Sequence, residues 1–147
     1  MAPIGGPTGG GQAGFGSGGS FTGPAEALEV IGNHAYAYAG ATGASVTEAT
    51  SLSFTTGNYY FVGVLTVNGA CNVDDLATGT TSGFTLKMNG AIISIMKTDT
   101  LSEDMPSTFK NAVIIAPYTE VEVLTQSEGN AADRLTSVLL TGRIYRE

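Results

Sequence analysis

The chain is poor in the side chains that most catalytic and metal sites use. Its 147 residues include one cysteine, one histidine and no tryptophan. A single cysteine, Cys71, excludes an intramolecular disulfide, a redox CxxC pair and a zinc site built on paired cysteines. A free thiol is typical of a reducing compartment. A single histidine, His34, removes most transition-metal sites, and no serine or cysteine nucleophile is evident beside it.

Positive charge is also scarce. Six lysine and arginine residues against 13 acidic residues give a net charge of -7 and a pI near 4.5. Binding to nucleic acid needs clustered positive side chains, whereas here the six are spread from Lys87 to Arg146. The same acidity disfavours adsorption to an anionic membrane surface. We therefore expect neither a nucleic-acid partner nor a membrane partner.

Long apolar runs are missing as well. No segment approaches the roughly 18 consecutive apolar residues of a membrane helix. The N-terminus has neither the basic region nor the apolar core of a signal peptide. We expect the protein to be made and kept in the cytoplasm until it assembles or is released. A chain of this length with 42% hydrophobic residues is typical of one globular domain.

Residues 1–24 differ from the rest in composition. They contain ten of the 21 glycines, three of the five prolines and no charged side chain. Apart from Met1, only Ile4, Phe15 and Phe21 are large and apolar, so we expect a flexible, extended arm. The arm is either a spacer or an anchor whose two phenylalanines enter pockets on a neighbouring subunit. The GxGxxG spacing within it lacks the preceding strand and following helix of a dinucleotide site.

The remainder of the chain has the pattern of short strands separated by turns. The longest two-residue alternations are 119–127 and 135–145. Val121 and Val123 share one face in the first run, and valine, leucine and isoleucine share one face in the second. This period predicts strands with one face against a core and the other in solvent or at a partner.

A hairpin is predicted at Asn89-Gly90. This dipeptide separates the strand-like runs 84–88 and 91–96. Because both turn residues tolerate positive φ, the pattern is a strong signal for a two-residue β-hairpin.

Two other runs point to contacts on both faces of a strand. The run 59–67 is the most apolar in the chain and has large residues at both odd and even positions. The turn-forming dipeptide Asn68-Gly69 is predicted to end it. Such a strand lies in the middle of a sheet covered on both sides, or at a subunit interface. In the run 34–39 a histidine and two tyrosines alternate with three alanines. The small-residue face is compatible with close packing against another copy or another strand.

Together these patterns predict an all-β fold. About eight short strands, with no long helical pattern and no βαβ rhythm, are typical of an antiparallel β-sandwich. The chain lacks the Cys, Trp, Cys framework of an immunoglobulin domain. A tight hairpin with long crossing loops at 71–83 and 98–110 favours a jelly roll of two Greek keys. We expect two parts: the arm, 1–24, and a jelly-roll domain, 25–147.

Acidic residues in two predicted loops are the only candidates for a metal site. Asp74 and Asp75 in one loop and Asp99, Glu103 and Asp104 in the other have the oxygen ligands that a hard cation prefers. Neither loop has DxDxDG spacing, so we interpret these residues as solvated charge. We predict no catalytic residue, no metal and no cofactor, and a protein that is not an enzyme.

Five aromatic residues are candidates for partner binding. Phe15 and Phe21 are those of the arm. Tyr59, Tyr60 and Tyr118 form either a sugar-stacking platform or, as is more usual for aromatics on apolar strands, part of the core or of an interface.

The Gly-rich arm, the hairpin FTLKMNGAIISIMK and the ending IIAPYTEVEVLTQSEGNAADRLTSVLLTGRIY resemble small structural proteins of tailed bacteriophages. The similarity is to jelly-roll capsid decoration, or cement, proteins, and it covers about residues 59–145. It implies a homo-oligomer, often a trimer, on the exterior of a virion. There it would stabilise the capsid by bridging major capsid protein subunits. The alternative is a receptor-binding or glycan-binding head of a phage fibre or spike, with loop 71–83 or 98–110 touching a host glycan.

Overall fold

The computed structural model describes residues 27–72, 79–98 and 108–146. These residues form ten strands and no helix. The strands are β1 (Glu29–Ile31), β2 (His34–Ala44), β3 (Ala49–Thr55), β4 (Tyr60–Asn72), β5 (Gly79–Thr80), β6 (Ser82–Met88), β7 (Ala91–Thr98), β8 (Thr108–Ile115), β9 (Glu120–Ser127) and β10 (Ala131–Tyr145).

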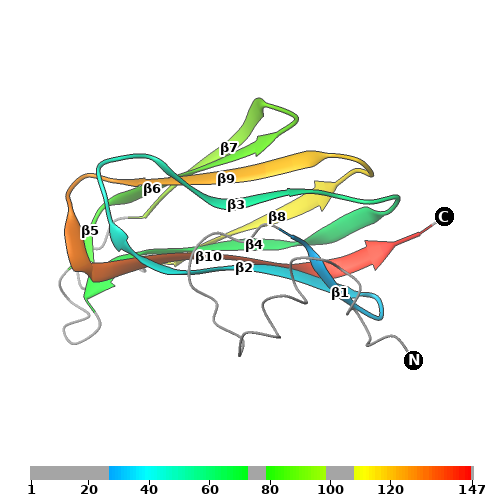
Figure 1. The fold of residues 1–147 in the computed structure, drawn as a ribbon, viewed down its shortest axis with the longest axis horizontal. Helices are drawn as coiled ribbons and strands as arrows, with labels where there is room; N and C mark the ends of the chain where they lie inside the picture. The colour runs from blue at the N-terminus through cyan, green and yellow to red at the C-terminus, as the bar shows by residue number, and fades with distance from the viewer. Residues whose placement is uncertain (1–26, 73–78, 99–107, 147) are drawn as a thin grey trace.

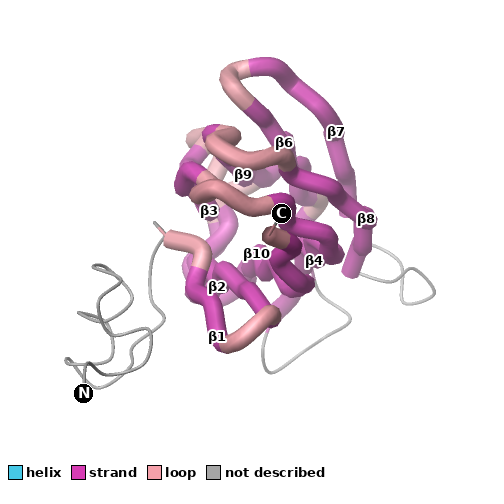
Figure 2. The backbone as a smooth tube through the Cα atoms, turned by 90° about the vertical axis from the view of Figure 1, so that its right-hand side faces the viewer, coloured by secondary structure: helices cyan, strands magenta, loops and turns pink. Residues whose placement is uncertain are grey.

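The strands form two antiparallel sheets that pack face to face (Figure 1). The larger sheet has the order β1-β2-β10-β4, and both β5 and β8 pair with β4. The smaller sheet has the order β3-β9-β6-β7. Figure 2, turned by 90°, shows the two layers, with β7 and β8 at neighbouring edges. The prediction of an antiparallel β-sandwich is confirmed.

The connections follow the jelly-roll pattern. Strands β2, β3, β4 and β6 alternate between the two sheets, β6 and β7 form a hairpin within one sheet, and β8, β9 and β10 alternate again. The resulting orders, β2-β10-β4-β8 and β3-β9-β6-β7, are two interleaved Greek keys. The eight strands of this pattern match the predicted number, and β1 and β5 are short additions at the edges of the larger sheet.

The core lies between the sheets and consists of the alternate side chains of each long strand that point inward. The predicted alternations in β9 and β10 are confirmed, because Val121, Val123, Val138, Leu140 and Ile144 are all buried. Each large side chain buried in this way contributes about 1.5–3 kcal/mol of transfer free energy. The largest fully buried side chains of the other strands are Phe61, Phe84, Leu52, Leu65, Met96 and Ile115.

The predicted hairpin joins β6 and β7. Asn89 has φ of 51° and Gly90 has φ of 79°, so both central residues are left-handed, as a type I′ turn requires. The Asn89 side chain also fixes the turn to β9. Its Oδ1 accepts a hydrogen bond from Glu120 N–H at 2.9 Å, and its backbone N–H donates to Glu120 C=O at 2.8 Å.

The prediction that a strand ends at Asn68-Gly69 was wrong, because β4 continues to Asn72. Asn68 is held in the sheet by side-chain hydrogen bonds to both neighbouring strands. It donates from Nδ2 to Ser137 Oγ at 2.8 Å and accepts at Oδ1 from Thr108 Oγ1 at 2.9 Å. These partners are distant in sequence and offset the turn preference of the dipeptide.

The two crossing loops are shorter than predicted. Within 71–83, β4 extends through Asn72, β5 pairs Thr80 with Ala70, and β6 begins at Ser82. Cross-strand pairing therefore overrides the polar composition of this segment. Within 98–110, β8 already begins at Thr108. The intervening residues 73–78 and 99–107, with the five loop acids, lie outside the described residues, as does the predicted arm.

Candidate functional site

The centre of the larger sheet presents apolar side chains on its outer face. Because Phe61 and Leu65 of β4 point into the core, the alternate residues Tyr60, Val62 and Val64 point away from it. Val62 retains 40% of its accessible surface. The strand lies between β10 and β8, as expected for a strand apolar on both faces, but described residues cover only its inner face.

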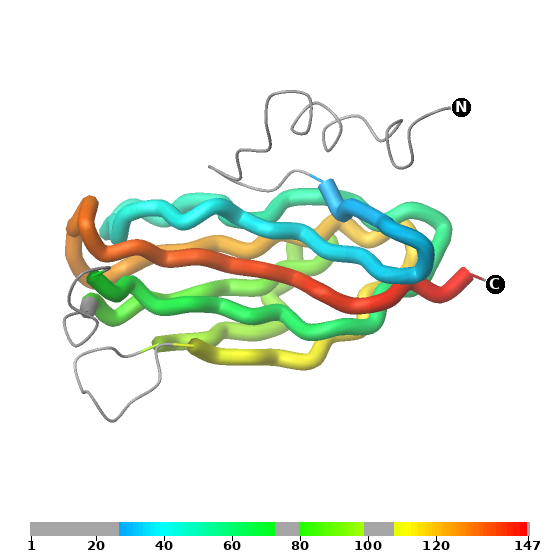
Figure 3. The backbone as a smooth tube through the Cα atoms, turned by 90° about the horizontal axis from the view of Figure 1, so that it is seen from below, coloured from blue at the N-terminus to red at the C-terminus, as the bar shows by residue number. Residues whose placement is uncertain are grey.

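The register of the sheet places further apolar residues beside these three. Tyr145 is paired with Tyr60, Ile114 with Val62, and Leu139 with Thr66. Ile114 is 68% exposed. Figure 3 looks onto this side of the sheet, where β2, β10, β4 and β8 run next to one another. We call this surface the apolar sheet face. Its members are Tyr36, Tyr38, Tyr60, Val62, Val64, Ile114, Leu139, Thr141 and Tyr145, and the exposed Arg143 lies among them on β10, between Thr141 and Tyr145.

Strand β2 supplies the aromatic part of this face. Tyr36 and Tyr38 point outward and their ring centroids lie 4.8 Å apart at an interplanar angle of 37°. The predicted aromatic face is thus confirmed. The three alanines that alternate with them point into the core, against the other sheet, and are not a contact surface for another copy. Burial raises the pKa of Tyr36, and the Glu29 carboxylate and Tyr38 raise it further.

Opposite charges stand at the two edges of the apolar sheet face. Glu29 on β1 is paired with Tyr36, and Lys110 on β8 is paired with Thr66. Across the sheet, Tyr36 is paired with Thr141, and Thr141 is paired with Val64. Val64 lies two residues from Thr66 on β4. Glu29 and Lys110 therefore lie two residues, about 7 Å, apart along the strands.

The outer face of the smaller sheet differs in character near its middle. Lys87 on β6 and Glu122 on β9 are paired in register, with 3.9 Å between Nζ and Oε1. Large exposed apolar side chains on the strands of this sheet are confined to its edge strand β7, where Ile95 is 72% exposed. The larger sheet thus carries the broader apolar surface.

The predicted partner-binding residues are distributed over several surfaces. Tyr59 packs partly buried against the core, whereas Tyr60 belongs to the apolar sheet face. Tyr118 lies 68% exposed in the β8–β9 turn, where its backbone N–H donates to Gly57 C=O at 3.1 Å. The three tyrosines therefore do not share one face. Phe15 and Phe21 lie outside the described residues.

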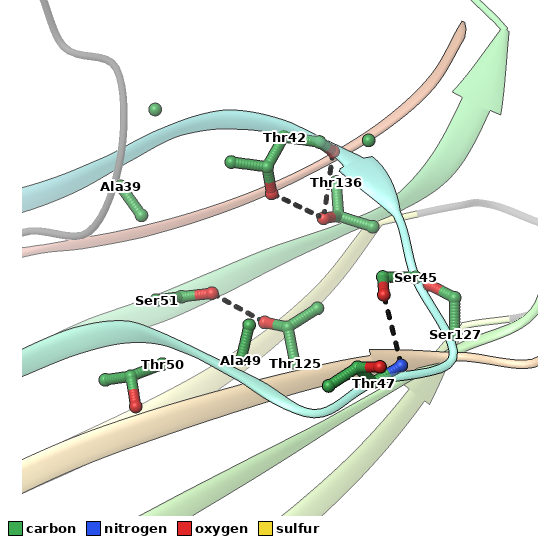
Figure 4. A pocket seen from close by; sticks show the side chains of 12 residues that line it. Ala39, Thr42, Ser45, Thr47, Ala49, Thr50, Ser51, Thr125, Ser127 and Thr136 are labelled. Atoms are coloured by element: carbon green, nitrogen blue, oxygen red, sulfur yellow. Dashed lines mark hydrogen bonds between the residues drawn. The ribbon is translucent and has the colours of Figure 1, made fainter. Parts of the chain in front are cut away.

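A cavity of about 210 Å³ opens between β2 and β3, at one end of the sandwich (Figure 4). Its twelve lining residues are all glycine, alanine, serine or threonine. Several hydroxyls bond to one another, as Ser51 Oγ does to Thr125 Oγ1 at 2.7 Å and Thr42 Oγ1 to Thr136 Oγ1 at 3.5 Å. The lining suits water or a small neutral polar molecule, and it brings no acid or base to the cavity.

Groups for metal or acid–base chemistry are sparse in the part of the chain that the structure describes. There, no three His, Cys, Asp or Glu side chains gather closely enough to hold a metal ion. His34 is exposed at the start of β2, and Cys71 is a half-buried free thiol in β4. Within the same residues, no helix is long and apolar enough to cross a membrane.

No protein-family model matches the chain, and no curated protein matches it significantly. The aromatic signal of β2 and the doubly apolar run of β4 were visible in the sequence. The contributions of Ile114 and Leu139 were not, because only the register places them beside β4.

Proposed function

We propose that the protein is a non-enzymatic structural protein of a bacteriophage virion. It decorates the capsid exterior and stabilises it by bridging major capsid protein subunits. The apolar sheet face is the observation that carries this proposal. A contiguous exposed apolar surface on a folded domain marks a protein interaction site, because leaving it in water costs free energy that a partner recovers.

The two parts of the chain take different roles in this proposal. The jelly-roll domain is the rigid body, which assembles as a homo-oligomer, a trimer in the arrangement that the phage resemblance implies. The arm is the anchor to the shell, with Phe15 and Phe21 as its large apolar contacts. Ordering a Gly-rich segment costs conformational entropy, which the contacts made on assembly offset. The protein is made in the host cytoplasm and resides on the capsid exterior.

Binding to capsids that lack the protein tests the anchor. We expect full-length protein to co-sediment with such capsids and to crosslink to the major capsid protein. The double variant Phe15→Ser, Phe21→Ser should bind more weakly while its unfolding midpoint stays the same. Absence of wild-type binding would contradict decoration of the capsid, and unchanged binding of the double variant would contradict the anchor role.

A glycan-binding head of a fibre or spike is the second candidate. The hydroxyl-lined cavity between β2 and β3 favours it, because an uncharged polar lining matches the hydroxyl groups of a sugar. Binding of the intact oligomer on a glycan array, lost in Ser51→Val, would support this candidate. Failure to bind any glycan would count against it.

A further inference from the structure

We propose that the apolar sheet face is covered by further copies of the same chain. The copies pack around an axis that runs along the strands, so that the β1 edge of one copy meets the β8 edge of the next. This inference rests on the homo-oligomer of the proposed function and names its interface and its orientation.

The size of the face fits an interface between copies. Strands lie about 4.8 Å apart and residues rise about 3.4 Å, so five strands over eight residues cover an area of the order of 600 Å². Standard interfaces bury about 800 Å² of accessible surface on each partner. The two areas are comparable, because protruding side chains make the accessible surface of the face larger than its flat area. Aromatic residues are also enriched at such interfaces, and the face carries Tyr36, Tyr38, Tyr60 and Tyr145.

The charges at the edges select the orientation. Rotation about an axis parallel to the strands brings one half of the face against the opposite half of a neighbouring copy. Glu29 of one copy then approaches Lys110 of the next, with an offset of two residues along the strands that the long lysine side chain can span. An axis lying in the face but perpendicular to the strands would instead place each edge against itself, with Glu29 facing Glu29 and Lys110 facing Lys110. Opposite charges across an interface fix its register, and like charges oppose it.

Arg143 is the positive side chain nearest the centre of the face. It is paired with His34 and Val62 and lies two residues from the end of β10, and it is exposed. An arginine on such a face can lay its apolar stem on it and turn its guanidinium to water, which limits like-charge repulsion between copies.

The N-terminal segment of the same chain is the competing occupant, since it leads directly into β1. Apart from Met1, residues 1–24 offer three large apolar side chains, Ile4, Phe15 and Phe21, among ten glycines. These three side chains are too few to cover the eight large apolar members of the face. A second copy brings an equal apolar area, whereas this segment does not.

The mass of the full-length protein in solution, by native mass spectrometry and sedimentation, tests the interface. We expect wild type to be a multiple of 15.0 kDa. Val64→Lys, at an exposed position in the middle of the face, should be a 15.0 kDa monomer with an unchanged far-ultraviolet circular dichroism spectrum. The matched control is Ile95→Lys on the smaller sheet, which should remain oligomeric. A monomeric wild type, an oligomeric Val64→Lys or a monomeric Ile95→Lys would overturn the proposal.

Charge reversal at the edges tests the orientation without placing charge in the apolar centre. Glu29→Lys and Lys110→Glu should each raise the dissociation constant about tenfold, which corresponds to about 1.4 kcal/mol. The double variant should return to within about threefold of wild type. If the losses of affinity in the two single variants add in the double variant, the proposed orientation of the copies is overturned. An oligomer that does not bind capsids would refute the proposed function alone, and capsid binding by a monomer would refute this inference alone.

Discussion

Gly63 on β4 and Gly142 on β10 are direct partners in the larger sheet, and the Phe61 ring occupies the space that a side chain at either position would need. A Cβ on Gly63 would lie 2.6 Å from Phe61 Cζ, and a Cβ on Gly142 would lie 2.7 Å from the same atom. Each would also collide with backbone of the opposite strand. The glycine pair thus lets Phe61 pack against the backbone directly beneath the apolar sheet face.

Alanine at either glycine should destabilise the fold. Because backbone on the opposite strand cannot move away easily, we expect Gly63→Ala and Gly142→Ala each to lower the free energy of unfolding by about 3 kcal/mol. Urea denaturation measures this. Gly83→Ala is the control, since a Cβ there would meet only Gln126 O, at 3.9 Å. It should change stability by less than about 0.5 kcal/mol. Equal effects at all three positions would contradict the packing of Phe61 against this glycine pair.

Thr56 should be a second point of high sensitivity. Its buried Oγ1 accepts from Thr119 N–H at 2.8 Å and donates to Ala116 C=O at 2.8 Å, which ties the end of β3 to the β8–β9 turn. Thr56→Val keeps the shape but leaves both backbone groups unpaired, so we expect a loss of about 2 kcal/mol in thermal or urea unfolding. The neighbouring, exposed Thr55→Val should have little effect. A neutral Thr56→Val would show that the hydrogen bonds contribute nothing.

Tyr118 adopts a left-handed conformation, with φ of 55°. Such a conformation is costly for a residue that is neither glycine nor asparagine, and it is often found where a side chain has a binding role. Tyr118→Asn should therefore raise the unfolding free energy by about 0.5–1 kcal/mol, and Tyr118→Ile should lower it by about 1 kcal/mol. If Tyr118 contacts the capsid, the asparagine variant will be more stable and yet bind capsids more weakly. Loss of stability in Tyr118→Asn would show that the tyrosine ring contributes more than the strained backbone costs.

The raised pKa of Tyr36 predicts a pH dependence of stability. Burial, then the Glu29 carboxylate and then Tyr38 disfavour the phenolate in the folded protein, whereas the pKa in the unfolded chain is about 10. The folded state therefore holds its proton to higher pH than the unfolded state. The stabilisation is complete below about pH 10 and is lost as pH rises through the folded pKa. In urea unfolding, Tyr36→Phe should lose less stability above pH 10 than wild type. Parallel curves for the two proteins would contradict the raised pKa.

Local signals in the sequence predicted a large part of the fold. Asn89-Gly90 specified a hairpin because both residues accept positive φ without help from distant contacts. The alternation of Val121 and Val123 likewise identified the core face of β9. Asn68-Gly69 misled because the Asn68 side chain finds Ser137, 69 residues along the chain, and a single sequence does not show that partner.

The candidate site was predicted less completely than the fold. In β2 the alternation showed one face of alanines and one of tyrosines, but a strand register shifted by one residue would exchange core and surface. The packing of Phe54 and the other core residues against the alanines decides between the two, and it depends on both sheets. Ile114 and Leu139 join the apolar sheet face only through their pairing with β4.

Burial of the apolar sheet face between protein chains would shield its tyrosines from hydroxyl radicals, and footprinting of the full-length protein measures this shielding. Tyr36, Tyr38, Tyr60 and Tyr145 should react slowly in wild type and faster in Val64→Lys, because only the variant leaves the face in water. Tyr118, in the exposed β8–β9 turn, should react at the same rate in both proteins. Equal rates for the four face tyrosines in the two proteins would contradict this burial.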